Sequence, residues 1–236
     1  MILQTLSNAV FQVELLPEVG RRIHRLRAYG RDLPRTPRDP AQHLKEPFFW
    51  GSYPLVPRSN RIPDGTFSFR GREVTIPCID GNTAIHGESY ARPWTVLGDG
   101  LLSFQGADFG FPWPYEARQQ FVLSDATLSF SVSTTNTPRE SMPAGLGIHP
   151  RFDASSLLLL AFAAELAYPL ADCIPSVSRG RSADGSIGGD PHLFPGDRQS
   201  LDRHHVRQGK DALAGEKSRT HARIHAHGDA LRRGRV

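Results

Sequence analysis

The feature that most constrains this chain is a series of short segments in its middle in which apolar and polar side chains alternate. Clean alternation places Leu128, Phe130 and Val132 on one face of an extended segment. Turn signals, not amphipathic helices, separate this segment from similar ones. The others cover residues 66–69, 94–97, 101–104 and 115–123. Short strands at this spacing are typical of packed antiparallel sheets, so the sequence predicts an all-β fold, a large antiparallel β-sandwich.

One part of this series predicts a β-hairpin. Phe67 and Phe69 lie on one face of the first segment, and Val74 and Ile76 supply the apolar face of the returning segment. The Arg-Gly dipeptide at 70–71 has the length of a two-residue turn between them. We therefore expect two paired strands joined at this dipeptide.

The N-terminal region predicts two further strands. Residues 10–15 and 22–27 alternate in part, and we expect His24 to be a solvated strand residue. Residues 34–46 are polar and rich in proline, which indicates a surface loop. The apolar stretch at 48–57, interrupted by Gly and Pro, indicates the wall of a pocket or a strand at a sheet edge.

Two stretches carry side chains suited to chemistry, and we expect them to face each other across a cleft. The first holds Asn60 and Arg61 before a turn and then His86 before a glycine, and the second holds His149. A guanidinium can fork onto neighbouring hydroxyls, and an imidazole can hold or release a proton near neutral pH. Pro150 restricts His149 to extended backbone, which would fix the direction of its imidazole.

Each of these residues also has an ordinary structural interpretation, which the sequence leaves open. Arg61 could be a surface residue paired with Asp64. His86 and His149 could each be a hydrogen-bonded structural histidine. No residue of the set predicts a site when it is taken alone.

Other classes of function find little support. No apolar run reaches the length of a membrane span, and two cysteines without an export signal favour a cytoplasmic location. The histidines at 204–205 and at 225 and 227 lack the spaced partners of a metal site. The glycines at 145 and 147 precede no helix and predict no dinucleotide loop. We expect no metal and no membrane association.

The chain changes character near residue 160. Residues 196–236 carry 10 Lys and Arg against 5 Asp and Glu and contain no Phe, Tyr or Trp. Such a segment adds little core, and its basic charge without stacking residues favours no specific nucleic-acid partner. A charged helix over 210–221 would lack an apolar stripe. We expect a β-sandwich region at 1–160 and a divergent tail at 161–236, either disordered or read in a shifted frame.

Four motifs in order resemble the aldose 1-epimerase (galactose mutarotase) family. They are PLVPRSNRIPDGTFSFRGREV, AIHGESYARPW, FPWPYEARQQFVLSDATLSFSVSTTNT and MPAGLGIHPRF, within a match over about residues 8–155. The resemblance implies a galactose mutarotase-like sandwich, no metal or organic cofactor, and a free sugar as the small-molecule partner. It leaves the oligomeric state unknown.

The resemblance also implies roles for single residues. Arg61, with Asn60 beside it, would bind the sugar, His86 would hold the ring, and His149 would act as general acid. A base would remove the proton of the anomeric hydroxyl while His149 protonates the ring oxygen, and ring opening, rotation about C1–C2 and closure would interconvert the α and β anomers of a hexose.

The C-terminal third departs from the family pattern, and a sandwich of this kind would be incomplete at its C-terminal end. The family's general base is a late glutamate, but Glu216 lacks strand-like apolar context and is not assigned. Leu201-Asp202 resembles a remnant of a sugar-contacting segment, which makes Asp202 a substrate-binding candidate. The expected function is aldose 1-epimerase; the alternative is a non-catalytic sugar-binding relative or an inactive fragment. Arg58 and Arg92 keep a phosphorylated sugar open as substrate.

Overall fold

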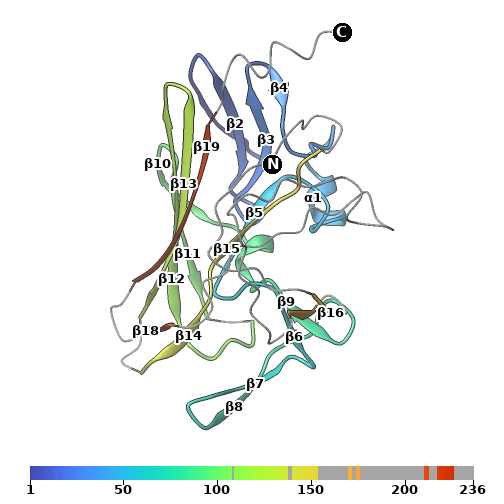
Figure 1. Cartoon of the computed structure of the whole chain (residues 1–236), viewed down its shortest axis with the longest axis vertical. Coiled ribbons are helices and arrows are strands. Elements are labelled where there is room, and N and C mark those ends of the chain that lie inside the picture. The colour runs from blue at the N-terminus through green and yellow to red at the C-terminus, as the bar shows by residue number, and fades with distance from the viewer. Residues whose placement is uncertain are drawn as a thin grey trace, which may run out of the picture.

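Strands dominate the fold, and the larger ones form two sheets that pack face to face (Figure 1). The structure is a computed structural model that describes residues 1–107, 109–137 and 140–153 and four strands at 170–171, 174–175, 210–212 and 217–225. Within these residues, helix is confined to α1 (Gln42–Lys45) and a 3-10 turn (Ser89–Ala91). No helix in this part of the chain is long and apolar enough to cross a membrane.

The first sheet has six strands, in the order β1-β2-β3-β5-β15 with β4 paired to β3, and its pairings are antiparallel. Its strands are β1 (Gln4–Ser7), β2 (Phe11–Leu16), β3 (Arg22–Ala28), β4 (Arg31–Asp32), β5 (Ser52–Leu55) and β15 (Gly147–Pro150). The sequence left β5 as a pocket wall or an edge strand, and the structure places it inside the sheet between β3 and β15.

The second sheet has five antiparallel strands in the order β10-β11-β12-β13-β19. They are β10 (Thr95–Gly98), β11 (Leu101–Gly106), β12 (Tyr115–Ser124), β13 (Thr127–Asn136) and β19 (Lys217–His225). The buried face of β13 holds Leu128, Phe130 and Val132. The alternation in the sequence therefore predicted both this strand and the face that it buries.

Two-stranded ribbons connect and flank the sheets. They are β6 (Arg61–Pro63) with β9 (Thr83–Ile85), β7 (Thr66–Phe69) with β8 (Arg72–Thr75), β14 (Met142–Ala144) with β18 (Lys210–Ala212), and β16 (Leu170–Ala171) with β17 (Ile174–Pro175). The β7–β8 ribbon is the predicted hairpin. Its turn residues Arg70 and Gly71 have φ of 50° and 77°, and a type I′ turn needs positive φ at both positions.

The core between the sheets explains why they pack. Val13 and Ile23 of the first sheet share a buried apolar cluster with Phe121, Leu128 and Phe130 of the second. Burial of apolar surface at about 25 cal/mol per Å² is the main favourable term in such a fold. The prediction of an all-β sandwich is confirmed, and Figure 1 shows the β10–β13 and β19 layer beside the β2–β5 layer.

The expectation that His24 is solvated is wrong, because the buried ring of His43 packs against it beside a β-bulge in β3. The register passes from Glu14 opposite Arg25 to Leu15 opposite Ile23, so His24 is an additional residue in β3. A bulge reverses the alternation of side chains along a strand. Ile23 and Leu26 consequently both reach the core, and His24 is 3% exposed.

The predicted surface loop needs correction, and the helix that lacked support in the sequence is absent from the described residues of 210–221. The predicted surface loop at 34–46 contains the short helix α1, and its His43 is fully buried. The segment at 210–221, considered as a charged helix, instead contributes β18 and the start of β19. Pairing of β19 with β13 supplies backbone hydrogen bonds that outweigh a weak local propensity.

Candidate active site

Strand β5 positions His149 through its antiparallel pairing with β15. His149 lies opposite Tyr53 in the register, and directly opposed residues of paired strands project on the same face. Their rings stack, with centroids 4.8 Å apart and planes 24° from parallel. Gly147 permits this approach of the two strands, because a Cβ there would lie 2.9 Å from Leu55.

The chain just after β5 also positions His86. Val56 forms a bridge with Gly87, and Asn60 accepts a hydrogen bond of 3.0 Å from the backbone N–H of His86. Gly87 has φ of 73°, and a Cβ there would lie 2.1 Å from the carbonyl oxygen of Val56. Only glycine fits such a position without displacing backbone.

The two imidazoles therefore meet, although they are more than sixty residues apart in the sequence. Their ring centroids lie 5.0 Å apart, with planes 81° from parallel. Phe48 lies edge-on to His86 at 5.7 Å and also contacts Tyr53 and Tyr90. The stretch that the sequence indicated as a pocket wall thus packs its aromatic rings against both histidines, which are only 3% and 1% exposed.

Arg61 and Asn60 lie beside this pair through backbone pairing. Arg61 is opposite Ile85, the residue before His86, and its Nε donates a 3.0 Å hydrogen bond to Asp80. The structural alternative for Arg61 named Asp64 as its partner, and the structure shows an ion pair with Asp80. Asn60 has φ of 58°, and its side-chain oxygen accepts a 2.9 Å bond from the N–H of Arg61. The structure gives Asn60 a role in shaping this turn.

A small open pocket includes Gly87, the residue after His86, in its lining. Its lining residues are Pro57, Arg58, Ile76, Gly87, Glu88, Phe109 and Phe111. Tyr115 donates a 2.9 Å hydrogen bond to Glu88, and burial, followed by the charge of Glu88, raises the pKa of that phenol. Burial lowers the pKa of Arg58 to about 10, so its guanidinium is still charged at neutral pH. Arg92 lies over Phe109 at 5.1 Å.

The sequence offered two late acidic residues, Asp202 as a sugar-contacting candidate and Glu216, which was not assigned as the base. Asp202 and Glu216 lie outside the described residues. Within the described part of the chain, no group of three or more His, Cys, Asp or Glu side chains is placed to hold a metal ion. The side chains that are described offer imidazole proton donors and acceptors, a guanidinium and aromatic faces.

Sequence reasoning missed two residues of this region, Arg22 and His43. Arg22 is fully buried, and its guanidinium lies over the ring of Tyr53 at 4.9 Å. His43 is also buried and contacts Arg22. An arginine beside a glycine turn and a histidine in a polar loop both have the local pattern of surface residues, so no signal in the sequence marks them.

Comparison with known proteins assigns the family. A family model described as aldose 1-epimerase matches residues 3–223. The chain is 31% identical over 107 residues to the uncharacterised protein YphB of Escherichia coli K12, and 30% identical over 104 residues to the uncharacterised protein YihR of the same organism. These matches cover 44% and 41% of this chain but 37% and 34% of the relatives. The chain therefore spans about a third of these curated relatives.

Solved structures agree on the fold. A galactose mutarotase-like protein of Clostridium acetobutylicum superposes with a TM-score of 0.64 at 20% identity, covering 75% of this chain and 60% of that one. A galactose mutarotase related enzyme of Lactobacillus acidophilus gives 0.69 at 13% identity, covering 96% and 98%. These identities speak for the fold, and the family model covers most of the sequence. The chain belongs to the aldose 1-epimerase family.

Proposed function

We propose that this protein is an aldose 1-epimerase that interconverts the α and β anomers of a free hexose. The observation that carries the proposal is the meeting of His86 and His149 at 5.0 Å, beside the turn that holds Arg61. Two imidazoles in one place supply the proton donor and the polar contact that ring opening needs. Family membership supports a sugar as the substrate.

In the proposed reaction the imidazolium of His149 gives a proton to the ring oxygen as the bond between that oxygen and C1 breaks. A base takes the proton of the anomeric hydroxyl, so that C1 becomes an aldehyde carbon. Rotation about C1–C2 and the reverse proton transfers close the ring on its other face. His86 and Arg61 would hold the ring hydroxyls, and none of the described residues is assigned as the base.

Polarimetry on freshly dissolved α-D-glucose and α-D-galactose tests the proposal. We expect the protein to accelerate mutarotation, and His149→Gln to lower kcat by about 10²–10⁴-fold, the usual contribution of a positioned proton donor. His86→Gln should raise KM as well. Near-ultraviolet circular dichroism establishes that each variant is folded. Folded wild-type protein that adds nothing to the rate in buffer would exclude the proposal.

A second candidate is a sugar-binding protein without turnover. The observation that favours it is the burial of His86 and His149, which are 3% and 1% exposed, because an acid catalyst must reach its substrate. This candidate predicts that hexose raises Tm, as any ligand of the folded state does, while mutarotation stays at the buffer rate. Isothermal calorimetry without a binding signal would remove it.

The same proposal includes a cytoplasmic location. Cys78 is an exposed free thiol, which suits a reducing compartment. Fractionation of the source cells tests this part by itself.

A further inference from the structure

Three residues on three adjacent strands form a row across one face of the first sheet. Ile23 lies opposite Ser52, so the antiparallel register places their neighbours, Arg22 and Tyr53, opposite one another. Tyr53 in turn lies opposite His149. The contacts agree, with the Arg22 guanidinium 4.9 Å and the His149 ring 4.8 Å from the Tyr53 ring. Tyr53 therefore lies between a buried cation and a candidate catalytic imidazole.

Arg22 is held in this row by neutral acceptors. Its Nε donates to the carbonyl of Val19 at 3.2 Å, and its two terminal nitrogens donate to the carbonyls of Pro47 and Tyr90 at 2.8 and 3.0 Å. Burial lowers its pKa to about 10, so it remains charged at neutral pH. A planar guanidinium bonded at three nitrogens has little freedom to turn. Three of the contacts that hold it next to Tyr53 are therefore to backbone, and the fourth is to a side chain.

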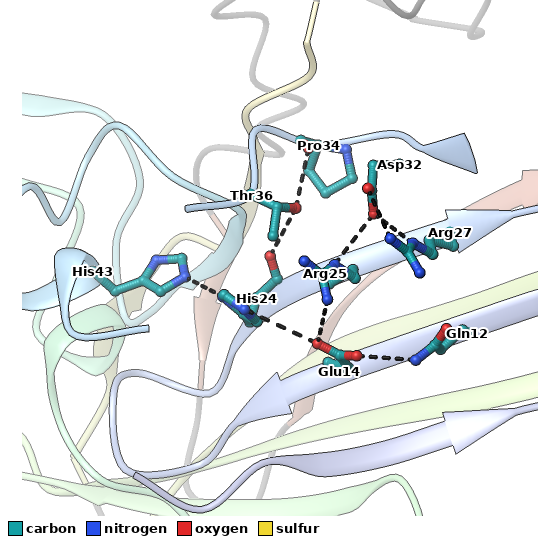
Figure 2. A network of polar contacts seen from close by, with 9 residues as sticks. All are labelled: Gln12, Glu14, His24, Arg25, Arg27, Asp32, Pro34, Thr36 and His43. Atoms are coloured by element: carbon teal, nitrogen blue, oxygen red, sulfur yellow. Dashed lines mark hydrogen bonds and ion pairs between the residues drawn. The ribbon is translucent and has the colours of Figure 1, made fainter. Parts of the chain in front are cut away.

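A relay of hydrogen bonds holds the remaining side of Arg22. Arg22 contacts Nδ1 of His43 at 3.3 Å, and because a guanidinium only donates, this nitrogen accepts. Burial, followed by the charge of Arg22, lowers the pKa of His43 to about 3. Neutral His43 must then carry its proton on Nε2 and donate it to Nδ1 of His24, 3.0 Å away. His24 keeps its own proton on Nε2, which faces Glu14 at 4.0 Å (Figure 2).

The outer end of this relay is anchored by charged groups on the sheet surface. Glu14 accepts a 2.9 Å bond from Gln12 and pairs with Arg25 at 3.5 Å. Figure 2 shows Arg25 reaching both Glu14 and Asp32, with Arg27 also bonded to Asp32. His24 and Arg25, adjacent residues at the β3 bulge, both reach Glu14. A connected set of polar contacts thus leads from the surface to the ring beneath His149.

We propose that Arg22 is a positioning residue for His149: it holds the Tyr53 ring, against which the imidazole stacks, in one orientation. The inference rests on the proposed function only where it concerns turnover. The stacking itself is independent of any substrate. Catalytic groups need this kind of support, because a misplacement of about 1 Å can cost about 10²-fold in rate.

The adjacent arginine provides a matched control. Arg21 is also fully buried, and it lies over Phe121 at 4.9 Å and donates to the carbonyl of Gly100. Burial lowers its pKa to about 9. Arg21 faces the second sheet, away from the histidines. Arg21→Lys and Arg22→Lys each remove a buried guanidinium that lies 4.9 Å from an aromatic ring, and only the second should affect His149.

The test has one readout that needs no activity and one that does. The imidazole Cε1–H resonance of His149, assigned with His149→Gln, should move in Arg22→Lys and stay in place in Arg21→Lys. If the protein is a mutarotase, Arg22→Lys should also lower kcat about tenfold, with KM changed by less than about twofold. Arg21→Lys should leave kcat per folded molecule unchanged. If the wild type shows no turnover, the resonance alone decides the positioning role.

The proposal is overturned if both variants leave the His149 resonance in place, or if both move it equally. If Arg22→Lys does not fold, His43→Leu takes its place, because it removes one contact of Arg22 and leaves the three carbonyl bonds. A folded His43→Leu protein should move the same resonance by a smaller amount. An unmoved resonance in that variant also overturns the proposal.

Discussion

At the scale of single residues, the buried histidines of the relay are kept neutral. Burial lowers the pKa values of both His24 and His43 below the ordinary 6.5, that of His43 to about 3. In each case desolvation disfavours the charged ring, and Arg22 adds repulsion at His43. Glu14 opposes the shift at His24 without cancelling it. The folded protein therefore binds fewer protons here than the unfolded chain does below pH 6.5.

This difference makes stability depend on pH. Above pH 6.5 the imidazoles are neutral in both the folded and the unfolded state, and the relay contributes its full share to the free energy of unfolding. As pH falls toward about 3, the unfolded chain binds a proton at residue 43, whereas His43 in the folded protein stays neutral. The free energy of unfolding therefore falls by up to about 1.4 kcal/mol per pH unit for this one proton. Urea unfolding between pH 4.5 and 7.5 measures it. His43→Gln should show a shallower slope, and equal slopes would contradict the assignment.

At the scale of elements, two glycines with the same backbone conformation have different surroundings. Gly71 in the β7–β8 turn has φ of 77°, and nothing lies within 4 Å of a Cβ built there. Gly87 after β9 has φ of 73°, but its Cβ would meet the carbonyl of Val56 at 2.1 Å. Gly71 is therefore required only for its left-handed backbone conformation. Gly87 is required both for this conformation and because there is no room for a Cβ atom.

Alanine substitutions at Gly71 and Gly87 measure separately the cost of a left-handed backbone and the cost of placing a Cβ atom. Gly71→Ala should cost about 1 kcal/mol, the price of a left-handed alanine. Gly87→Ala should cost more than about 3 kcal/mol, because backbone atoms of Val56 and Pro57 cannot move aside cheaply. It should also displace His86 and lower activity. Urea unfolding and polarimetry measure both effects, and equal costs would contradict the packing at Gly87.

At the scale of the whole molecule, the end of the described chain returns to the second sheet. β19 pairs with β13 from Thr127 opposite His225 to Thr135 opposite Lys217. Without this strand β13 would present an unpaired edge, which promotes aggregation. The division into a sandwich region at 1–160 and a divergent tail at 161–236 remains a prediction. The pairing of β13 is the place to test it.

Hydrogen exchange on the intact chain distinguishes a β19 strand that pairs with β13 in solution from a disordered tail at 161–236. Alternate N–H groups of β13 donate to β12 and to β19 in an antiparallel ladder. If the pairing of β19 persists in solution, both sets are protected from exchange. If residues 161–236 are a disordered tail, only the set that faces β12 is protected. The N–H groups of β12 that face β11 serve as the internal reference.

Much of the fold could be predicted, because alternation is a local property. The alternation of Leu128, Phe130 and Val132 predicts β13 and its buried face. The dipeptide at 70–71 predicts a hairpin turn. The bulge at His24 could not be predicted, since its cause is the pairing of β2 with β3. β19 could not be predicted either, because its partner lies about ninety residues earlier in the chain.

By itself, the sequence determined the sandwich, the hairpin and the family motifs that single out Arg61, His86 and His149. Only the tertiary structure decided that the two imidazoles meet, that Tyr53 stacks against His149, and that Arg22 lies against the other side of Tyr53. The physical reason is the range of the interactions. Side-chain alternation and turn chemistry act between near neighbours in the chain, whereas strand pairing and burial join β3, β5 and β15 across long separations.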